Sequence, residues 1–166
     1  MTHANSQRFV LSIYPTSRGY AFVLFEGPQN VYDWGMKEIR KNRKNEATLK
    51  SIRGLIERYR PEYILMEDYN EPASRRSSRI KKLYRMITNL AESECIDMSY
   101  IPHSAILTCF ASAKTKHEIA HAIAQQIPAL AHRLPRLRQI WMSEDPRQSL
   151  FDAAALGAAF YAIQSG

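Results

Sequence analysis

Three acidic side chains stand at positions that a folded chain could bring together. Glu67 and Asp68 directly follow Tyr63–Met66 (YILM), a short continuous apolar run typical of a buried parallel strand. Asp152 lies near the start of Arg147–Ile163, a segment rich in small residues that is expected to form the terminal helix. Carboxylate oxygens are the ligands that Mg²⁺ prefers in proteins. The pattern predicts an acidic metal site if the terminal helix packs beside the end of the strand.

The stretch Phe9–Glu26 supplies the part of the sheet that would hold this site. It is expected to form a strand over Phe9–Tyr14 and a second strand over Tyr20–Phe25. The turn between them contains a proline, which presets one dihedral angle, and a glycine, which tolerates positive φ. A residue at the carboxyl end of a buried central strand is held rigidly, and that residue is Tyr14. Because the carboxyl ends of the first and fourth strands can lie side by side, Tyr14 and Glu67 are expected to be neighbours.

The whole chain follows the order β-β-β-α-β-α-β-α-α. This order predicts an α/β fold with one mixed five-stranded sheet, a three-stranded antiparallel meander plus parallel strands, flanked by helices in a single domain over residues 1–166. The remaining expected segments are a third strand over Asn30–Met36 with a bulge at Gly35, a basic loop over Lys37–Lys44, helices from about Asn45, Arg76 and Thr115, a strand over Asp97–Ile101, a short helix over Ala105–Ala111, and Ala129–Ile140 with few structural signals.

The chain is basic, and its basic residues cluster. Lys and Arg number 23 against 16 Asp and Glu, which gives a net charge of +7. Lys37–Lys44 (KEIRKNRK) has five bases and one acid, and Arg75–Arg85 (RRSSRIKKLYR) has six bases and no acid. Two such runs favour a nucleic-acid surface, although solvated loop and helix faces are the alternative. The candidate backbone contacts are Arg40, Lys41, Arg43, Lys44, Arg75, Arg76, Arg79, Lys81 and Lys82.

Several classes of protein are disfavoured by composition. The 166 residues contain no apolar stretch of transmembrane length, and the N-terminus lacks the apolar core of a signal peptide, so no membrane association is expected. The two cysteines, Cys95 and Cys109, form neither a metal-binding spacing nor a disulfide framework. The expected location is therefore a reducing cytoplasm.

Four motifs, in this order, resemble the RuvC-like Holliday junction resolvases of the RNase H-like superfamily. Leu11–Glu26 (LSIYPTSRGYAFVLFE) is similar to the first hairpin of that family, whose motif is I-D-P-G followed by a G-[YFW] strand. Tyr63–Asp68 (YILMED) resembles the strand that ends in a catalytic glutamate. Ala113–Pro128 (AKTKHEIAHAIAQQIP) resembles the helix that begins near a lysine, and Phe151–Phe160 (FDAAALGAAF) resembles the terminal helix. The hairpin is similar to that of a bacterial branch distinct from the housekeeping resolvases.

The resemblance implies an RNase H-like fold and a metal-dependent, structure-specific endonuclease. Such an enzyme hydrolyses phosphodiester bonds of branched DNA during recombination and repair, and acts as a homodimer. Two Mg²⁺ (or Mn²⁺) ions held by carboxylates flank the scissile phosphate. Carried over to this sequence, Glu67 matches the strand-four glutamate, Asp152 matches one aspartate of the terminal helix, and Lys116 matches the lysine that binds the phosphate. Branched or double-stranded DNA is the expected partner, and RNA is not excluded by these motifs.

Two positions depart from the family pattern. Tyr14 stands where the family places its first catalytic aspartate, and the second acid of the terminal helix falls at Ala155. A neutral phenol, with a pKa of about 10, is a poor Mg²⁺ ligand at pH 7. Other carboxylates that could supply the missing ligands are Asp68, Asp145, Glu144 and Asp33.

Each candidate residue also has a purely structural interpretation. Glu67 could cap a helix or pair with an arginine of the 75–85 run, and Tyr14 could be a packed aromatic residue. Asp152 could be a first-turn residue favoured by the helix dipole, and Lys116 an exposed helix residue.

Three classes of function therefore stay open. The first is the metal-dependent junction endonuclease. The second is a catalytically impaired RNase H-fold protein that binds nucleic acid without cleaving it, which the residues Tyr14 and Ala155 favour. The third is half of an actin-like or sugar-kinase-type ATPase, which begins with a similar strand–turn–strand but would need a second phosphate-binding glycine loop.

Overall fold

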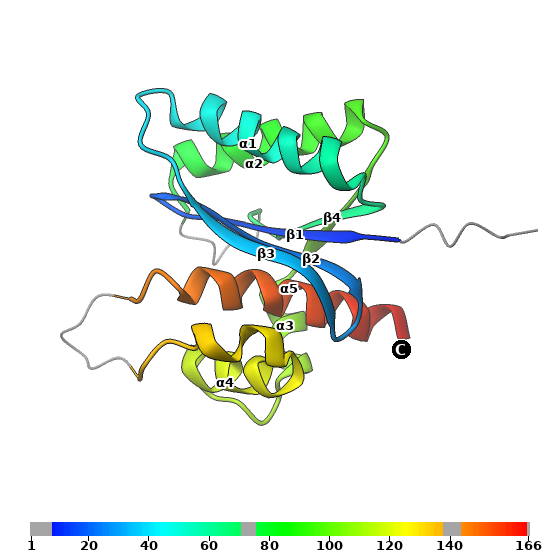
Figure 1. Ribbon diagram of the computed structural model, residues 1–166, viewed down its shortest axis with the longest axis vertical. Coiled ribbons are helices and arrows are strands. Elements are labelled where there is room, and N and C mark those ends of the chain that lie inside the picture. The colour runs from blue at the N-terminus through cyan, green and yellow to red at the C-terminus, as the bar shows by residue number, and fades with distance from the viewer. Residues whose placement is uncertain (1–7, 71–75, 138–143, 166) are drawn as a thin grey trace, which may run out of the picture.

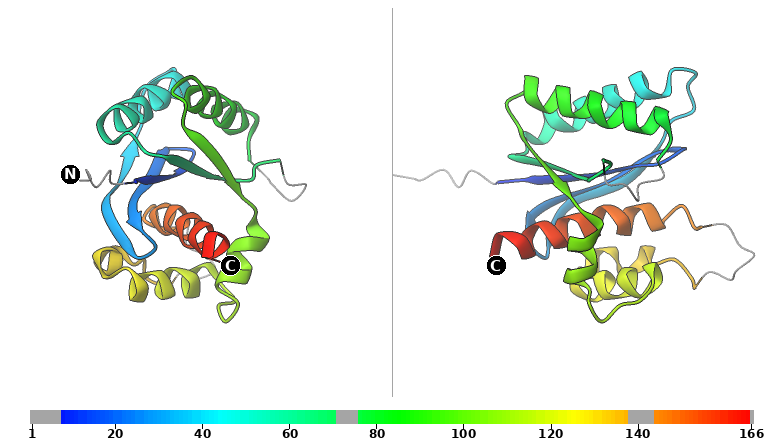
Figure 2. Two further views of the ribbon diagram at one scale, coloured as in Figure 1. Left: turned by 90° about the vertical axis from the view of Figure 1, so that its right-hand side faces the viewer. Right: turned by 180° about the vertical axis from the view of Figure 1, so that it is seen from behind.

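The computed structural model describes residues 8–70, 76–137 and 144–165. In these residues a five-stranded sheet lies between two layers of helices (Figures 1 and 2). The strands are β1 (Val10–Pro15), β2 (Gly19–Gly27), β3 (Asn30–Glu38), β4 (Tyr63–Glu67) and β5 (Asp97–Ile101). The helices are α1 (Lys44–Tyr59), α2 (Ser78–Ser93), α3 (His103–Cys109), α4 (Lys116–Gln126), the 3₁₀ helix η1 (Pro128–Arg133) and α5 (Gln148–Ser165).

The strand order of the sheet is β3-β2-β1-β4-β5. β1 pairs antiparallel with β2, and β2 pairs antiparallel with β3, which makes the expected meander. β4 pairs parallel with both β1 and β5. The predicted mixed sheet is confirmed. Since β1 and β4 are parallel neighbours, their carboxyl ends, near Tyr14 and Glu67, lie at the same edge of the sheet.

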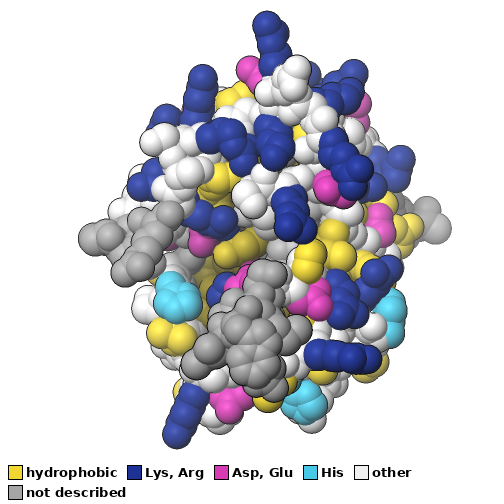
Figure 3. Space-filling view, turned by 90° about the vertical axis from the view of Figure 1, so that its left-hand side faces the viewer, with side chains coloured by type: hydrophobic (Ala, Val, Ile, Leu, Met, Phe, Trp, Pro, Cys, Tyr) yellow, Lys and Arg dark blue, Asp and Glu magenta, His cyan; other side chains and the backbone are white. Residues whose placement is uncertain are grey.

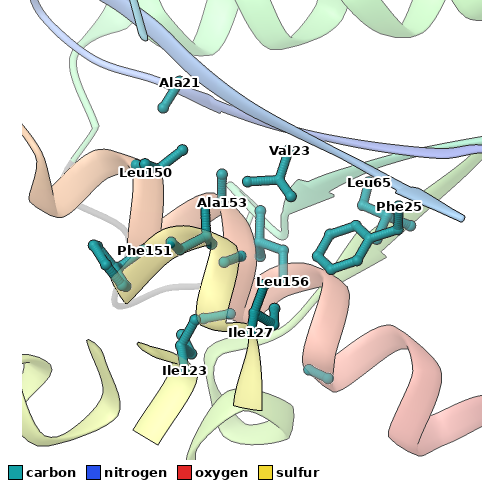
Figure 4. Close-up of a cluster of buried hydrophobic side chains, with 14 of the residues drawn as sticks. Ala21, Val23, Phe25, Leu65, Ile123, Ile127, Leu150, Phe151, Ala153 and Leu156 are labelled. Carbon is teal, nitrogen blue, oxygen red and sulfur yellow. The ribbon is translucent and has the colours of Figure 1, made fainter. Parts of the chain in front are cut away.

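Two hydrophobic clusters hold the helices on the two faces of the sheet. α1 and α2 cover one face, where Ile13, Ile56 and Leu83 are fully or almost fully buried. α5, α3, α4 and η1 cover the other face, where Val23 and Phe151 are among the buried residues (Figure 4). Buried side chains on both faces explain why β1 and β4 read as continuous apolar runs instead of alternating ones.

Helix α5 packs directly against the sheet, and this contact positions the acidic residue of the terminal helix. The hydroxyl of Ser12, a fully buried residue of β1, donates a hydrogen bond to the carbonyl of Ala153 at 2.5 Å. Further along α5, a Cβ atom on Gly157 would lie 2.1 Å from the Phe25 ring, so only glycine permits this approach. Asp152, the residue directly before Ala153, is therefore held beside the end of β1.

The start of α2 differs from the expectation. The sequence predicts a helix from about Arg76, but α2 begins at Ser78, because the Ser77 hydroxyl accepts a hydrogen bond from the backbone N–H of Ile80 and caps the helix. Arg76 therefore precedes the helix. The predicted start of α4 near Thr115 is confirmed: Thr115 is the N-cap and forms a reciprocal capping box with Glu118.

Three local expectations are wrong. Gly35 forms no bulge; the register of β2 and β3 shifts between Leu24 and Gly27 instead. Gly19 has no positive φ; glycine is required there because a Cβ would lie 1.8 Å from the Lys37 carbonyl oxygen. The basic segment predicted as a loop is shorter than expected, since β3 runs to Glu38 and α1 begins at Lys44.

Two segments that follow β5 differ in part from the expectations. The short helix predicted over Ala105–Ala111 is α3, which begins two residues earlier. Part of Ala129–Ile140, which showed few signals, belongs to η1, and its last residues lie outside the described part of the chain. Among the described residues, no helix combines the length and the apolar character needed to cross a membrane.

Candidate functional site

The candidate residues from four separate segments converge on one cavity. Tyr14 from β1, Glu67 from β4, Asp152 from α5 and Lys116 from the first turn of α4 line the same space of about 90 Å³. The parallel pairing of β1 with β4 brings the first two together, and the close packing of α5 on β1 adds the third. The cavity is also lined by Asp68, His103, Gln148 and Ala155.

The Glu67 carboxylate is engaged by groups of this chain. The guanidinium of Arg76 forms an ion pair with it, with 2.5 Å between Nε and Oε1, and the two side chains are 20% and 26% exposed. The hydroxyl of Tyr84 donates a hydrogen bond to the same Oε1 atom. The Arg76 guanidinium also donates to the Tyr84 hydroxyl at 3.3 Å. The sequence left open whether Glu67 binds metal, caps a helix or pairs with an arginine of the 75–85 run. In the structure it pairs with Arg76.

Tyr14 completes this arrangement as a neutral aromatic residue. Its half-buried ring lies under the Arg76 guanidinium, with 4.6 Å between Cζ and the ring centroid. Burial, with a smaller contribution from Asp152, raises the pKa of the Tyr14 phenol, so the side chain is uncharged at neutral pH. Tyr14 therefore contributes a π face for a cation rather than an anionic oxygen for a metal.

Asp152 lies in the deeper part of the cavity. Its side chain is 14% exposed, and Gln148 donates a hydrogen bond to its Oδ1 atom at 3.2 Å. The Lys116 ammonium lies 3.7 Å from Asp152 Oδ2 and 3.5 Å from Glu144 Oε2. Burial raises the pKa of Asp152 to about 6, while the charge of Lys116 and the bond from Gln148 act in the opposite direction.

The other candidate carboxylates are distributed more widely. Asp68 lines the cavity, and its Oδ1 atom accepts the backbone N–H of Asn70. Asp145 lies in the adjacent groove and pairs with Arg147 at 2.8 Å, which lowers its pKa. Asp33 accepts a hydrogen bond from the Tyr59 hydroxyl and lines neither the cavity nor the groove.

A wider groove opens beside the cavity. It has a volume of about 750 Å³, shares Tyr14 and Asp152 with the cavity, and is also lined by Arg76. The end of the β1–β2 hairpin contributes Arg18, and the end of β3 contributes Lys37. The groove therefore gives ligands a path to the Arg76 guanidinium, with both basic and acidic side chains along it.

The described residues do not fit the two-metal site that the family resemblance implies. Within residues 8–70, 76–137 and 144–165, no three acidic, histidine or cysteine side chains are grouped so that they could hold a metal ion. Tyr14 and Ala155 replace two expected carboxylates, and the Arg76 guanidinium already neutralises the third, Glu67. A divalent ion at Glu67 would have to compete with a cation that is covalently part of the chain.

Several of the predicted phosphate contacts have intramolecular partners. The Lys44 ammonium donates to the Ser17 carbonyl at 2.8 Å, and Arg40 pairs with Glu38 at 3.1 Å. Arg79 donates to the Asn45 side chain at 3.0 Å, a contact between α2 and α1. The exposed bases of the predicted set are Arg40, Lys41, Arg43 and Lys82, while Lys44, Arg76, Arg79 and Lys81 are half-buried, and Arg75 lies outside the described residues.

Two residues of the site carried no functional signal in the sequence. Tyr84 stands at helical spacing with Ile80, Leu83 and Ile87, a pattern typical of the buried face of a helix, and nothing in that periodicity indicates that its hydroxyl reaches Glu67. Gln148 lies one turn before Asp152, a spacing that places the two side chains on the same face of α5 and could have suggested their hydrogen bond.

Solved structures share this fold. The chain has the RuvC-like variant of the RNase H-like fold, and it superposes on solved structures of Holliday junction resolvases. Thermus thermophilus RuvC superposes with a TM-score of 0.65 at 14% sequence identity, over 95% of this chain and 96% of that chain. T. thermophilus RuvC in complex with its Holliday junction substrate gives a TM-score of 0.64 at 12% identity, over 95% of this chain and 96% of that chain.

A second resolvase shows the same fold. The yeast mitochondrial Holliday junction resolvase Ydc2 superposes with a TM-score of 0.65 at 15% identity, over 96% of this chain and 80% of that chain. No protein-family model matches the sequence, and no curated protein matches it significantly. The expected fold is confirmed by structural similarity. At sequence identities this low, the similarity supports the fold and nothing further.

Proposed function

We propose that this chain is a RuvC-fold protein that binds branched DNA and does not cleave it by metal-dependent hydrolysis. The observation that carries the proposal is the ion pair between Arg76 and Glu67 beside the Tyr14 ring. In the family pattern, this position requires anionic oxygens that are accessible to metal ions. Here it holds a matched cation and a neutral phenol.

The charge distribution supports binding to a polyanion. Residues 37–85 contain fifteen of the 23 Lys and Arg residues and seven of the 16 Asp and Glu residues. This segment therefore has a net charge of +8, against +7 for the whole chain, so the other residues together are almost neutral. It contains α1, the first half of α2 and the connection between β3 and α1, and these lie in the helical layer on one face of the sheet.

The basic layer, by which we mean the part of the helical layer formed by residues 37–85, borders the end of the sheet where the cavity lies. In Figure 3, Lys and Arg side chains gather over the upper half of this end, around a hollowed area with apolar side chains. Exposed Lys41 and Arg43 come from the β3–α1 connection, and exposed Lys82 comes from α2. Such side chains contact phosphates and position a duplex without reading its sequence.

Branched DNA is the substrate class that we carry over from the structural neighbours. One of them is described as a RuvC bound to its Holliday junction substrate. A four-way junction has approximate two-fold symmetry, which a two-fold homodimer would match. We therefore propose a homodimer, with the exposed face of α2 or the residues 129–140 as the candidate contact.

The metal-dependent junction endonuclease is the second candidate. One observation favours it: Glu67, Asp152 and Lys116, the three residues that match the family pattern, line the same cavity. In addition, Asp152 Oδ2 is buried and accepts no hydrogen bond within the described residues. This candidate requires Mg²⁺ or Mn²⁺ to displace Arg76 from Glu67.

The test is binding of a labelled four-way junction in EDTA, with a linear duplex of the same length as competitor. We expect tight, salt-sensitive binding with preference for the junction, and weaker binding after charge removal at Lys41 and Lys82. A matched control is Arg8→Ser, since Arg8 is exposed but precedes β1, at the opposite end of that strand from Tyr14. Equal affinity for junction and duplex would contradict the proposed substrate class, and absence of binding would contradict the proposed function.

A further inference from the structure

Arg76 occupies the centre of a small cluster of aromatic and acidic side chains. Its Nε atom lies 2.5 Å from Glu67 Oε1, and its Cζ atom lies 4.6 Å from the Tyr14 ring centroid and 6.0 Å from that of Tyr84. Tyr69 stacks on Tyr84, with centroids 4.8 Å apart and planes inclined by 4°. The cation thus has a carboxylate partner, two neighbouring rings and a rigid support.

The charges of this cluster balance without any added ion. Glu67 is the acidic member, Arg76 is the basic member, and burial raises the pKa of both Tyr14 and Tyr84, so both phenols stay neutral. An aspartate at position 14 would add a second negative charge and would remove the aromatic face over which the guanidinium lies. Tyr14 and Arg76 therefore fit together as a pair: each side chain makes the other favourable at this position.

The neighbouring carboxylates, Asp152 and Glu144, also lie close to a basic side chain of the chain. The Lys116 ammonium stands 3.7 Å from Asp152 and 3.5 Å from Glu144, so the second acidic position also faces a cation of the chain. Lys116 is 56% exposed, however, and its contribution is weaker than that of Arg76, which is 20% exposed.

We infer that Arg76 is a built-in cation that takes the place of a divalent metal ion at Glu67, with Tyr14 as the substitution that makes room for it. The cluster of Glu67, Arg76, Tyr14 and Tyr84 is then neutral and preorganised in the absence of metal, and divalent ions neither bind at Glu67 nor stabilise the protein through it. The inference deepens the proposed function, and it rests on that function only for the role of the site in DNA binding. The exclusion of metal from Glu67 is a property of the protein without DNA.

This inference predicts that two substitutions together open the site to metal. The double variant Tyr14→Asp/Arg76→Ser has carboxylates at both strand ends and no internal cation between them. The measurement is the thermal midpoint, Tm, in EDTA and in Mn²⁺, without DNA. We expect the wild type to show the same Tm in both, and the double variant to gain about 5–10 °C at a Mn²⁺ concentration about 100-fold above its Kd.

Two controls make the result specific. Glu67→Gln in the double-variant background should remove the Mn²⁺ effect. Tyr14→Asp/Arg79→Ser keeps Arg76 and removes instead an arginine that contacts Asn45, so it should gain less from Mn²⁺ than the Arg76 variant. A folded double variant with no Mn²⁺ effect would overturn the inference.

A second measurement decides the case in which the double variant does not fold. In wild-type protein, Mn²⁺ should leave the NMR signals of the residues around Glu67 unbroadened. Selective broadening that Glu67→Gln abolishes would overturn the inference, because it would show that a divalent ion binds there despite Arg76. Both measurements omit DNA. A result that overturns the inference therefore does not decide whether the protein binds junctions, and the junction-binding test can fail or succeed separately.

Discussion

Replacing Asp152 by asparagine should stabilise the protein at neutral pH and have almost no effect in acid. Asp152 is 14% exposed, and its burial raises its pKa from 3.8 to about 6. The folded state therefore holds the Asp152 proton more tightly than the unfolded chain does. This group favours folding below pH about 4, and its contribution is lost as the pH rises through about 6.

The size of the effect follows from the shift in pKa. One pKa unit corresponds to about 1.4 kcal/mol, so a shift of about two units is worth up to about 3 kcal/mol. The asparagine amide resembles the protonated acid in shape and has no charge to desolvate. Loss of the Lys116 contact subtracts little, since that side chain is 56% exposed. We expect Asp152→Asn to raise the free energy of unfolding by about 1–3 kcal/mol at pH 7.

The assay is urea unfolding of both proteins between pH 4 and pH 7, and the quantity of interest is the difference between them. Asp145→Asn is the matched control with the opposite sign. Hydrogen bonds from Arg147 lower the pKa of Asp145 from its ordinary value of 3.8, so that variant should lose stability at pH 7 and keep the same deficit down to pH 4, because the deficit shrinks only at lower pH. An Asp152→Asn variant that is destabilised at pH 7, or a difference independent of pH, would refute the reasoning.

Three other substitutions test separate parts of the structure. Arg76→Ala should destabilise the fold by about 2–3 kcal/mol in urea unfolding, because it leaves the largely buried Glu67 carboxylate without its cation; a neutral effect would contradict the ion pair. Gly157→Ala should lower Tm by several degrees in a thermal melt, since its Cβ would lie 2.1 Å from the Phe25 ring, and an unchanged Tm would contradict the close packing of α5. Lys82→Ser should reduce the slope of log K against log salt for junction binding by about 0.9, whereas Arg8→Ser should leave it unchanged; equal slopes for both variants would argue against the basic layer as the contact surface.

The arrangement of the sheet could be predicted because burial leaves a periodic signature. Largely apolar runs without alternation, such as Phe9–Tyr14 and Tyr63–Met66, indicated strands covered on both faces, and the helical spacing after Asn45 indicated α1. The order of these elements then placed the ends of β1 and β4 side by side, so the proximity of Tyr14 and Glu67 followed from topology.

The identity of Glu67's partner could not be predicted in the same way. The 75–85 run offers six bases, and among the described ones Arg76, the residue directly before the cap at Ser77, is the one that pairs with Glu67. The sequence indicated a phosphate contact at this arginine, as at its neighbours. Likewise, the hydrophobic periodicity of α2 accounts for the burial of Tyr84 but not for the direction of its hydroxyl. Contacts of this kind depend on how separate elements pack, and a local pattern does not record them.

The most direct test of the account is cleavage of a labelled four-way DNA junction at saturating protein in Mn²⁺, with Glu67→Gln in parallel. We expect the junction to be bound in EDTA and in Mn²⁺ alike, and its strands to stay intact with both proteins. Mn²⁺-dependent cuts by the wild type that disappear in Glu67→Gln would contradict it, because they would require a working metal site at a carboxylate that Arg76 is proposed to close.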